Sequence, residues 1–268
     1  TEHWFAPYYE KMTGGYSYAF YLSTDSTVPF DVEVYSGNDL VATVNGVAKG
    51  APQVWTLTAA EAAQYLVTRS ETDAMTPKMK GLQLVGERPF LASIRVASSV
   101  HGETMTLKGR SAKGTEFRVA ATPYTGDNNG MNATAGVLAT EDNTTVTLSE
   151  YGTGIQFEGV NGTVPSSYTY NLNKGQSVVF SAKHNSIGKF IGAKIVSNKP
   201  VVVTNGNANG NFGNDTSSGS DLIMDQAVPI ERLGSTFTMV RSLSPLVPDE
   251  NMEGGMVIAT ENNTEVYI

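Results

Sequence analysis

The sequence contains no cysteine among its 268 residues. Thiolate nucleophiles, iron–sulfur clusters and thiolate zinc sites are therefore excluded. A eukaryotic secreted module of this size would often carry disulfides. The absence of cysteine therefore favours a bacterial source or a reducing compartment.

Charge is also scarce, because only 16% of residues are Asp, Glu, Lys or Arg, against about 25% in typical soluble domains. The formal net charge is −8, whereas a nucleic-acid-binding protein normally carries a basic face. We therefore expect no nucleic-acid partner. No apolar run approaches the roughly 18 consecutive residues of a membrane-spanning helix, so we expect a soluble chain without membrane insertion.

Motifs of catalysis are missing as well. The histidines form no His-x-x-x-His pattern, and there are three of them: His3, His101 and His184. Gly-x-Ser-x-Gly elbows and Walker loops do not occur. A glycosidase needs two carboxyl groups in a cleft, and we interpret the closely spaced pair Asp31 and Glu33 as part of a solvated face. We therefore predict that the protein is not an enzyme.

The sequence does contain an internal repeat. The segment ATEDNTTVTL at 139–148 returns as ATENNTEVYI at 259–268, 120 residues later, with six of ten positions identical. GTEF at 114–117 and GSTF at 234–237 have the same offset. In an earlier copy, GLQLVGERPFLAS at 81–93 matches GAKIVSNKPVVVT, which begins at Gly192. A fixed period of this length indicates duplicated structural units.

We therefore predict three parts. Residues 1–113 form a first, degenerate β repeat, and residues 114–233 form a second. Residues 234–268 begin a third repeat or add strands that complete a shared sheet. Because Ile268 is an apolar strand-type residue, we expect the chain to be a piece of a longer repetitive protein.

The local patterns predict an all-β fold. Segments such as TVTLSEY and SVVFSA alternate with period two and are rich in β-branched residues. We expect ATEDNTTVTL to form a hairpin, and the prolines of GERP and SNKP to begin strands. One helix is expected at 58–66, where Thr58 and Glu61 form a capping box. The spacing favours tandem antiparallel β-sandwiches of about 115–120 residues, with a β-propeller as the alternative.

Two long polar segments, 125–134 and 205–221, are predicted to be loops that contact a ligand or partner. The contact residues would be Asp127, Asn128, Asn129, Asn207, Asn209, Asn211, Phe212 and Asn214. Carboxylate and amide oxygens are calcium ligands, and we name Asp215 and Asp221 as candidate Ca²⁺ ligands. A glycan or protein contact and a plain loop remain open as alternatives.

Four segments of the chain resemble the N-terminal region of the IgGFc-binding protein family. They are ATEDNTTVTL, LNKGQ, IVSNKPVVVTNGN and DLIMDQAVPIERLGSTF. That type of domain also occurs in large secreted adhesins of Bacteroidota, including gliding-motility surface proteins. The lack of cysteine favours this bacterial branch. The family name implies binding to the Fc part of immunoglobulin, but no Fc-contacting residue can be matched to a position here.

The sequence and the resemblance together predict a non-catalytic, extracellular repeat module of a cell-surface adhesin or motility filament. Its expected partners are a surface glycan, a host or substratum protein, or neighbouring repeats of the same chain. Two alternatives remain: a carbohydrate-binding module or glycan-active enzyme, and a purely structural stalk spacer.

Overall fold

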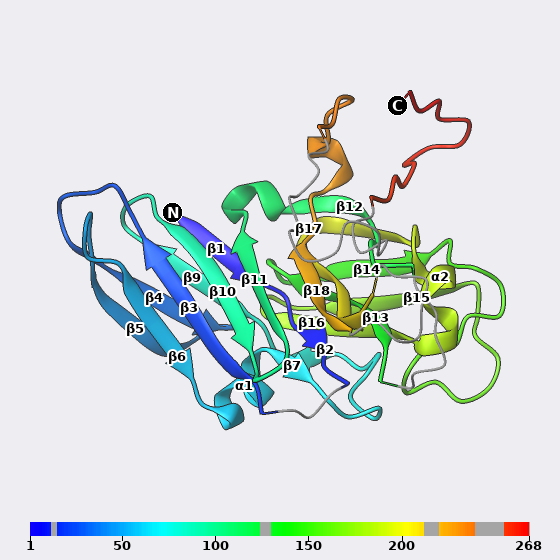
Figure 1. Ribbon diagram of the computed structural model, residues 1–268, viewed down its shortest axis with the longest axis horizontal. Helices are drawn as coiled ribbons and strands as arrows, with labels where there is room; N and C mark the ends of the chain where they lie inside the picture. The colour runs from blue at the N-terminus through cyan, green and yellow to red at the C-terminus, as the bar shows by residue number, and fades with distance from the viewer. Residues whose placement is uncertain (12–14, 124–129, 212–219, 239–254, 268) are drawn as a thin grey trace.

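The computed structural model describes residues 1–11, 15–123, 130–211, 220–238 and 255–267 (Figure 1). Antiparallel sheets dominate this part of the chain, so the predicted all-β class is confirmed. The helical pieces are short: α1 (Ala59–Tyr65), α2 (Ile187–Phe190) and the 3₁₀ turns η1 (Gly109–Ala112), η2 (His184–Ser186) and η3 (Ile230–Arg232). None of the described helices is long and apolar enough to cross a membrane.

The first unit consists of two four-stranded sheets, in the part of the chain before residue 108. One sheet has the order β1 (Glu2–Phe5), β9 (Leu82–Gly86), β4 (Phe30–Ser36), β5 (Asp39–Val47). The other has the order β11 (Gly102–Leu107), β10 (Leu91–Ala97), β3 (Ser17–Ser23), β6 (Gln53–Leu57). A short parallel ribbon of β2 (Tyr8–Tyr9) and β7 (Val67–Thr68) lies beside them.

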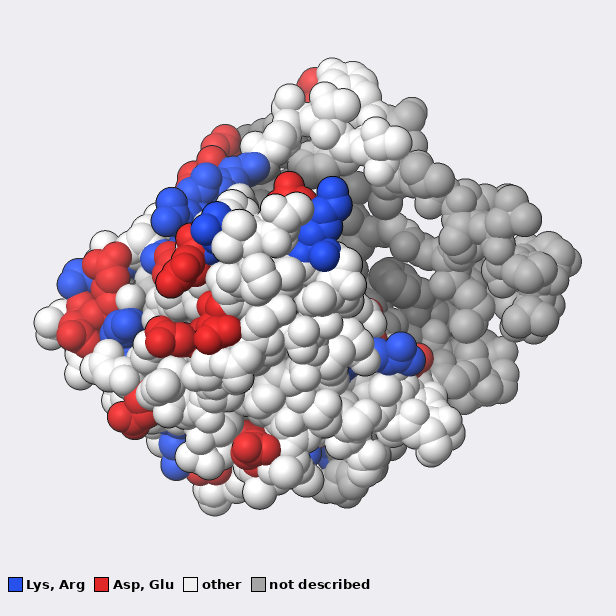
Figure 2. Space-filling model, turned by 90° about the vertical axis from the view of Figure 1, so that its left-hand side faces the viewer, with Lys and Arg blue, Asp and Glu red and all other residues white. Residues whose placement is uncertain are grey.

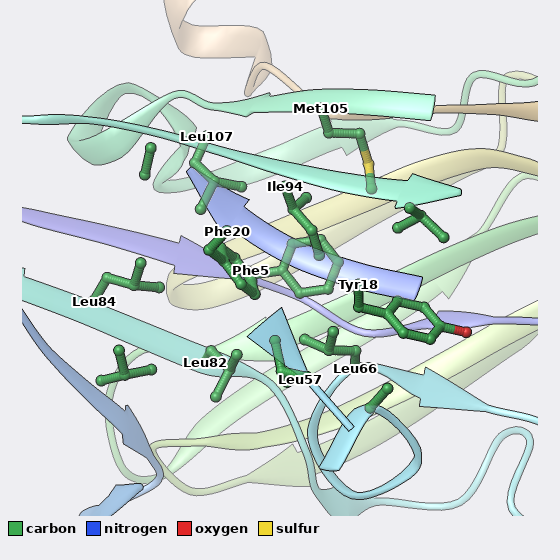
Figure 3. Packing of buried hydrophobic residues seen from close by; sticks show 14 of the residues in the cluster. Phe5, Tyr18, Phe20, Leu57, Leu66, Leu82, Leu84, Ile94, Met105 and Leu107 are labelled. Atoms are coloured by element: carbon green, nitrogen blue, oxygen red, sulfur yellow. The ribbon is translucent and has the colours of Figure 1, made fainter. Parts of the chain in front are cut away.

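The two sheets of the first unit enclose one apolar core (Figure 3). Buried and exposed residues alternate along β3 and β4, because successive strand side chains point to opposite faces. Both sheets contribute fully buried residues, among them Phe20, Ile94, Val34 and Leu84. This face-to-face packing is that of a sandwich, so the sandwich and not the propeller describes the first unit.

The second unit is one eight-stranded sheet built on β17 (Lys194–Gly210). One side of β17 carries β13 (Asn132–Ala139) and β14 (Thr144–Ser149), which are extended outward by β16 (Gln176–Lys183), β8 (Lys78–Met79) and β15 (Ser167–Leu172). The other side carries β12 (Gly114–Arg118) and β18 (Asp221–Gln226). A second apolar core lies against these strands and includes Phe117, Val137, Val146, Phe180 and Ile195.

The two units share one strand order. The orders β1-β9-β4-β5 and β11-β10-β3-β6 of the first unit recur in the second as β12-β17-β14-β15 and β18-β17-β13-β16. The units differ at one place. In the first unit the chain between β9 and β10 leaves the sheet, whereas in the second the corresponding segment stays within β17 and joins both half-sheets. The repeat boundaries at 113 and 233 stay predictions.

Two local predictions about strands are wrong. Strands β13 and β14 do not form a hairpin, because both run antiparallel to the same side of β17, one after the other. Pro200 does not begin a strand but lies inside β17. Among the described strands, none pairs with residues 198–200, since β13 ends opposite Val201 and β14 pairs no further than Ser197. A proline without an N–H therefore costs no ladder hydrogen bond there.

Three segments meet at this break in the pairing, and we call residues 140–143, 173–175 and 198–200 the kink corner. Lys199 Nζ donates to Asp142 O (2.5 Å), and Asn198 Oδ1 accepts from Thr145 N (2.7 Å). Thr140 Oγ1 donates to Pro200 O (2.7 Å). Asp142 Oδ1 in turn accepts from Lys174 N (3.0 Å). These hydrogen bonds hold the ATEDNTT, LNKGQ and SNKP segments next to one another, although the segments are far apart in the sequence.

The helix prediction is confirmed. Helix α1 begins after Thr58, whose Oγ1 accepts from Glu61 N (3.2 Å), and the Glu61 carboxylate accepts from Thr58 N (2.7 Å). This reciprocal pair satisfies two N–H groups that the first helical turn leaves free.

The two units are in direct contact. Tyr9 N donates to Thr134 Oγ1 (3.0 Å), and Asn132 Nδ2 donates to Tyr9 O (3.3 Å). A Cβ added at Gly136 would lie 1.6 Å from the carbonyl oxygen of Pro7. Glycine at position 136 therefore permits the backbone of the first unit to cross β13 at van der Waals distance.

Candidate functional site

The two polar segments leave the second sheet at the same end. Asn132, near the start of β13, is the register partner of Asn209, near the end of β17. Six of the predicted contact or calcium residues lie outside the described residues: Asp127, Asn128, Asn129, Phe212, Asn214 and Asp215. The described part of the candidate site therefore consists of the strand ends from which these segments depart.

The prediction that 205–211 is an exposed loop is wrong. Asn207 and Asn209 belong to β17, Asn211 follows it directly, and all three are buried. Their polarity is typical of loops, but here the polar groups find partners inside the protein. Asn207 Oδ1 accepts from Thr122 N (2.6 Å), and Thr122 Oγ1 accepts from Asn211 N (3.2 Å). Thr122, in the segment after β12, thus contacts both Asn207 and Asn211.

At this end of the second sheet, several buried polar atoms have no hydrogen-bond partner among the described residues. They are Asn132 Oδ1, Asn207 Nδ2, Thr204 Oγ1 and both amide atoms of Asn209. A buried polar group without a partner costs about 1–3 kcal/mol. Amide groups offer donors and acceptors together, so ordered water or a polar ligand group can satisfy them.

Asp221 lies at the edge of this region and bridges the two units. Its Oδ1 accepts from Gly102 N (3.0 Å) and from Leu222 N (2.7 Å), and it lies 3.4 Å from His101 Nδ1. Within the described ranges, no group of three or more His, Asp or Glu side chains is placed to hold a metal ion. The calcium site at Asp215 and Asp221 stays a prediction.

A buried ion pair within the first unit was not marked by any sequence motif. Glu10 is almost fully buried, accepts from Tyr18 Oη (2.6 Å) and from Arg69 Nε (2.7 Å), and so joins β3 to the end of the β2–β7 ribbon. Burial raises the pKa of Glu10, while the hydrogen bonds from Tyr18 and Arg69 oppose that shift. Each carboxylate oxygen has a partner, so we interpret the cluster as structural.

The carboxylate pair singled out in the sequence lies on the surface, as predicted. Asp31 and Glu33 are exposed on β4, where Asp31 Oδ1 accepts from Gly46 N (2.9 Å) and Glu33 accepts from Tyr35 Oη (2.6 Å). Figure 2, which shows the first-unit end of the molecule, has acidic and basic side chains intermixed over a largely uncharged surface. This face carries no extended patch of one sign.

Comparison with known proteins gives one match. A family model described as IgGFc binding protein matches residues 102–268, which include β11, every strand of the second unit except β8, and the described residues that follow that unit. No curated protein and no solved structure matches the chain. Since the matched residues make up more than half of the sequence, the chain belongs to the IgGFc binding protein family.

Proposed function

We propose that this chain is an extracellular, non-catalytic module of a bacterial surface protein, and that it attaches the cell to a partner through the end of the second sheet. Membership of a family of binding domains supports a binding role. The low charge and the lack of cysteine favour a bacterial surface protein, as in the adhesins and motility proteins that the sequence resembles.

The register pair Asn132 and Asn209 is the observation that carries the proposed location. It places the start of β13 next to the end of β17, at one end of the sheet. Strand β17 is held by β13 and β18 near this end and by β12 and β14 nearer its beginning. Binding residues are commonly located on loops held by such a rigid scaffold.

The partner we propose is a folded protein, and the Fc region of immunoglobulin is the first one to test because the family is described by that ligand. The contact residues we propose are those named from the sequence, which lie outside the described residues: Phe212 as the aromatic anchor, and Asp127, Asn128, Asn129 and Asn214 as polar contact residues. A central aromatic surrounded by polar groups is the usual arrangement of a binding hot spot.

Binding of purified Fc to the immobilised protein tests the proposal. Phe212→Ala should weaken binding about 30-fold, as expected for a hot-spot residue worth about 2 kcal/mol. Asn38→Ala is the matched control, because Asn38 is exposed at the turn between β4 and β5 in the first unit. Equal affinity of the Phe212→Ala variant and the unmodified protein would refute the proposed contact.

A glycan partner is the alternative within the same site. A glycan array separates it from the protein partner, because binding to sugars without binding to Fc would assign the aromatic side chain to carbohydrate stacking. Binding to neither probe would favour the structural spacer.

A further inference from the structure

The two units also meet where a turn of one lies against a turn of the other. Gly37 lies between β4 and β5 of the first unit, and Gly175 lies between β15 and β16 of the second. A Cβ added at Gly175 would lie 2.2 Å from Gly37 Cα and 2.6 Å from Gly37 N. Both glycines are buried and have left-handed φ angles, of 63° and 80°. The main chains of the two turns are therefore in direct contact, with no room for a side chain between them.

The side chain of Met79 in β8 covers this contact. Its Sδ would lie 2.7 Å from a Cβ at Gly37 and 3.2 Å from a Cβ at Gly175, so the thioether lies against both glycines. Met79 is the register partner of Gln176, the residue that follows Gly175. Strand β8 precedes the second unit in the chain but pairs with β16 at one end of the second sheet. The sulfur therefore lies where three segments of the chain meet.

Met79 is also open to solvent, since 52% of its surface is exposed. The other described methionines are buried or half-buried: Met75, Met105, Met131, Met224 and Met256. An oxidant must reach the sulfur, so an exposed methionine reacts before a buried one. Because the chain contains no cysteine, its oxidisable sulfur is that of methionine. Within the described part of the chain, Met79 is therefore the methionine most accessible to an oxidant.

We propose that Met79 is a redox-sensitive modification site, whose oxidation to the sulfoxide loosens the contact between the two units. The oxidant is a peroxide, such as hydrogen peroxide. The thioether sulfur attacks one peroxide oxygen with an electron pair, and the O–O bond breaks as the S–O bond forms. The proton of the transferred oxygen passes to the leaving hydroxide, which departs as water. The sulfur is thereby oxidised by two electrons and the peroxide is reduced by two.

The tight packing around the sulfur explains why one added oxygen atom matters. The sulfoxide is larger than the thioether, and it turns a flexible apolar side chain into a polar one. Next to Gly37 there is no room even for a methyl group, since a Cβ there would lie 2.7 Å from Sδ. The oxidised side chain must therefore displace one of the turns or turn away into water. In either case the two glycines lose the apolar group that covers them, and the contact between the units weakens.

The effect should extend into the second sheet, because Gly175 belongs to the kink corner. Gly175 N donates to Ala139 O (2.9 Å), which holds the turn against the end of β13. Gln176 N donates to Asn173 O (2.9 Å) and closes the turn itself. A turn that moves away from Gly37 strains these bonds. Oxidation of Met79 should therefore speed hydrogen exchange of the amides in 173–177.

Graded treatment of the whole protein with hydrogen peroxide, followed by peptide mass spectrometry, tests the proposal. The Met79 peptide should gain one oxygen about tenfold faster than the peptides of Met105 and Met224, which are 1% and 5% exposed. Once Met79 is oxidised, the melting temperature should fall by roughly 5 °C, as expected for crowding of a packed contact. Oxidation of Met79 no faster than that of the buried methionines would overturn the proposal. So would an unchanged melting temperature of the oxidised protein.

Variants assign the effect to one residue. Met79→Leu conserves the apolar volume and cannot be oxidised, so peroxide should no longer lower the melting temperature. Met79→Gln puts a polar group of similar length at the same place and should lower the melting temperature without any oxidant. Met256→Leu is the matched control, because Met256 is a half-buried methionine elsewhere in the chain, and this variant should respond to peroxide as the unmodified protein does. An equal loss in Met79→Leu and the unmodified protein would refute the assignment.

Discussion

Replacing Gly136 by alanine tests the contact between the two units at its closest point. The added Cβ would lie 1.6 Å from Pro7 O, whereas real Cβ contacts essentially never fall below 3.0 Å. Either β13 or the segment around Pro7 must therefore move by more than an ångström. The adjacent hydrogen bonds of Tyr9 with Thr134 and Asn132 cannot survive such a shift.

The cost follows from these two effects. Overpacking of an interior typically costs about 1–3 kcal/mol, and each of two lost hydrogen bonds adds about 1 kcal/mol. We expect Gly136→Ala to lower the free energy of unfolding by about 4 kcal/mol and the melting temperature by roughly 10 °C.

Urea unfolding followed by tryptophan fluorescence and circular dichroism measures this loss. Gly188→Ala is the control, because a Cβ at Gly188 meets no heavy atom within 4 Å and alanine favours the helical conformation there. If both variants unfolded within about 0.5 kcal/mol of the unmodified protein, the close packing of the units at Gly136 would be refuted.

Three further predictions concern local chemistry. Asn143→Ala should destabilise the protein by about 1 kcal/mol, because Asn143 has a left-handed backbone angle, with φ of 56°, at which alanine is disfavoured, and Asn143→Gly should not; equal midpoints in urea would contradict this. Burial lowers the pKa of His3, although hydrogen bonds to Phe90 O and Leu107 O oppose the shift. The native state then binds fewer protons at His3 than the unfolded state, so its contribution to stability should fall as pH drops below about 6.5; a ¹H NMR titration giving His3 a pKa above that of a free histidine would contradict it. Millimolar Ca²⁺ should raise the melting temperature by several degrees over EDTA if Asp215 and Asp221 bind it, and Asp221→Asn should abolish the rise; no rise would exclude the calcium site.

How much of the fold was predictable depends on how local the interactions are. The capping box of Thr58 and Glu61 involves residues three apart, so the sequence predicts helix α1 directly. The turn at 140–143 was predicted for the same reason. Its role in the sheet was not, because β13 and β14 are related only through β17, which lies more than 50 residues away along the chain.

The candidate site shows the same limit. The sequence placed Asn207, Asn209 and Asn211 in a loop, because polarity alone cannot distinguish an exposed loop from a buried strand whose amides bond internally. The partner of Asn207 is Thr122, and nothing in the sequence around either residue indicates that contact. The Glu10–Arg69 pair was missed because a single carboxylate and a single guanidinium form no motif.

The continuous path of β17 through both half-sheets has a mechanical consequence. In the first unit, the break between β9 and β10 lets a pulling force along the strands open one half-sheet while the other stays intact. In the second unit, the same force acts on a strand whose hydrogen bonds to β12, β13, β14 and β18 must be sheared together. Under tension, the second unit should therefore extend last and bear the load for longest.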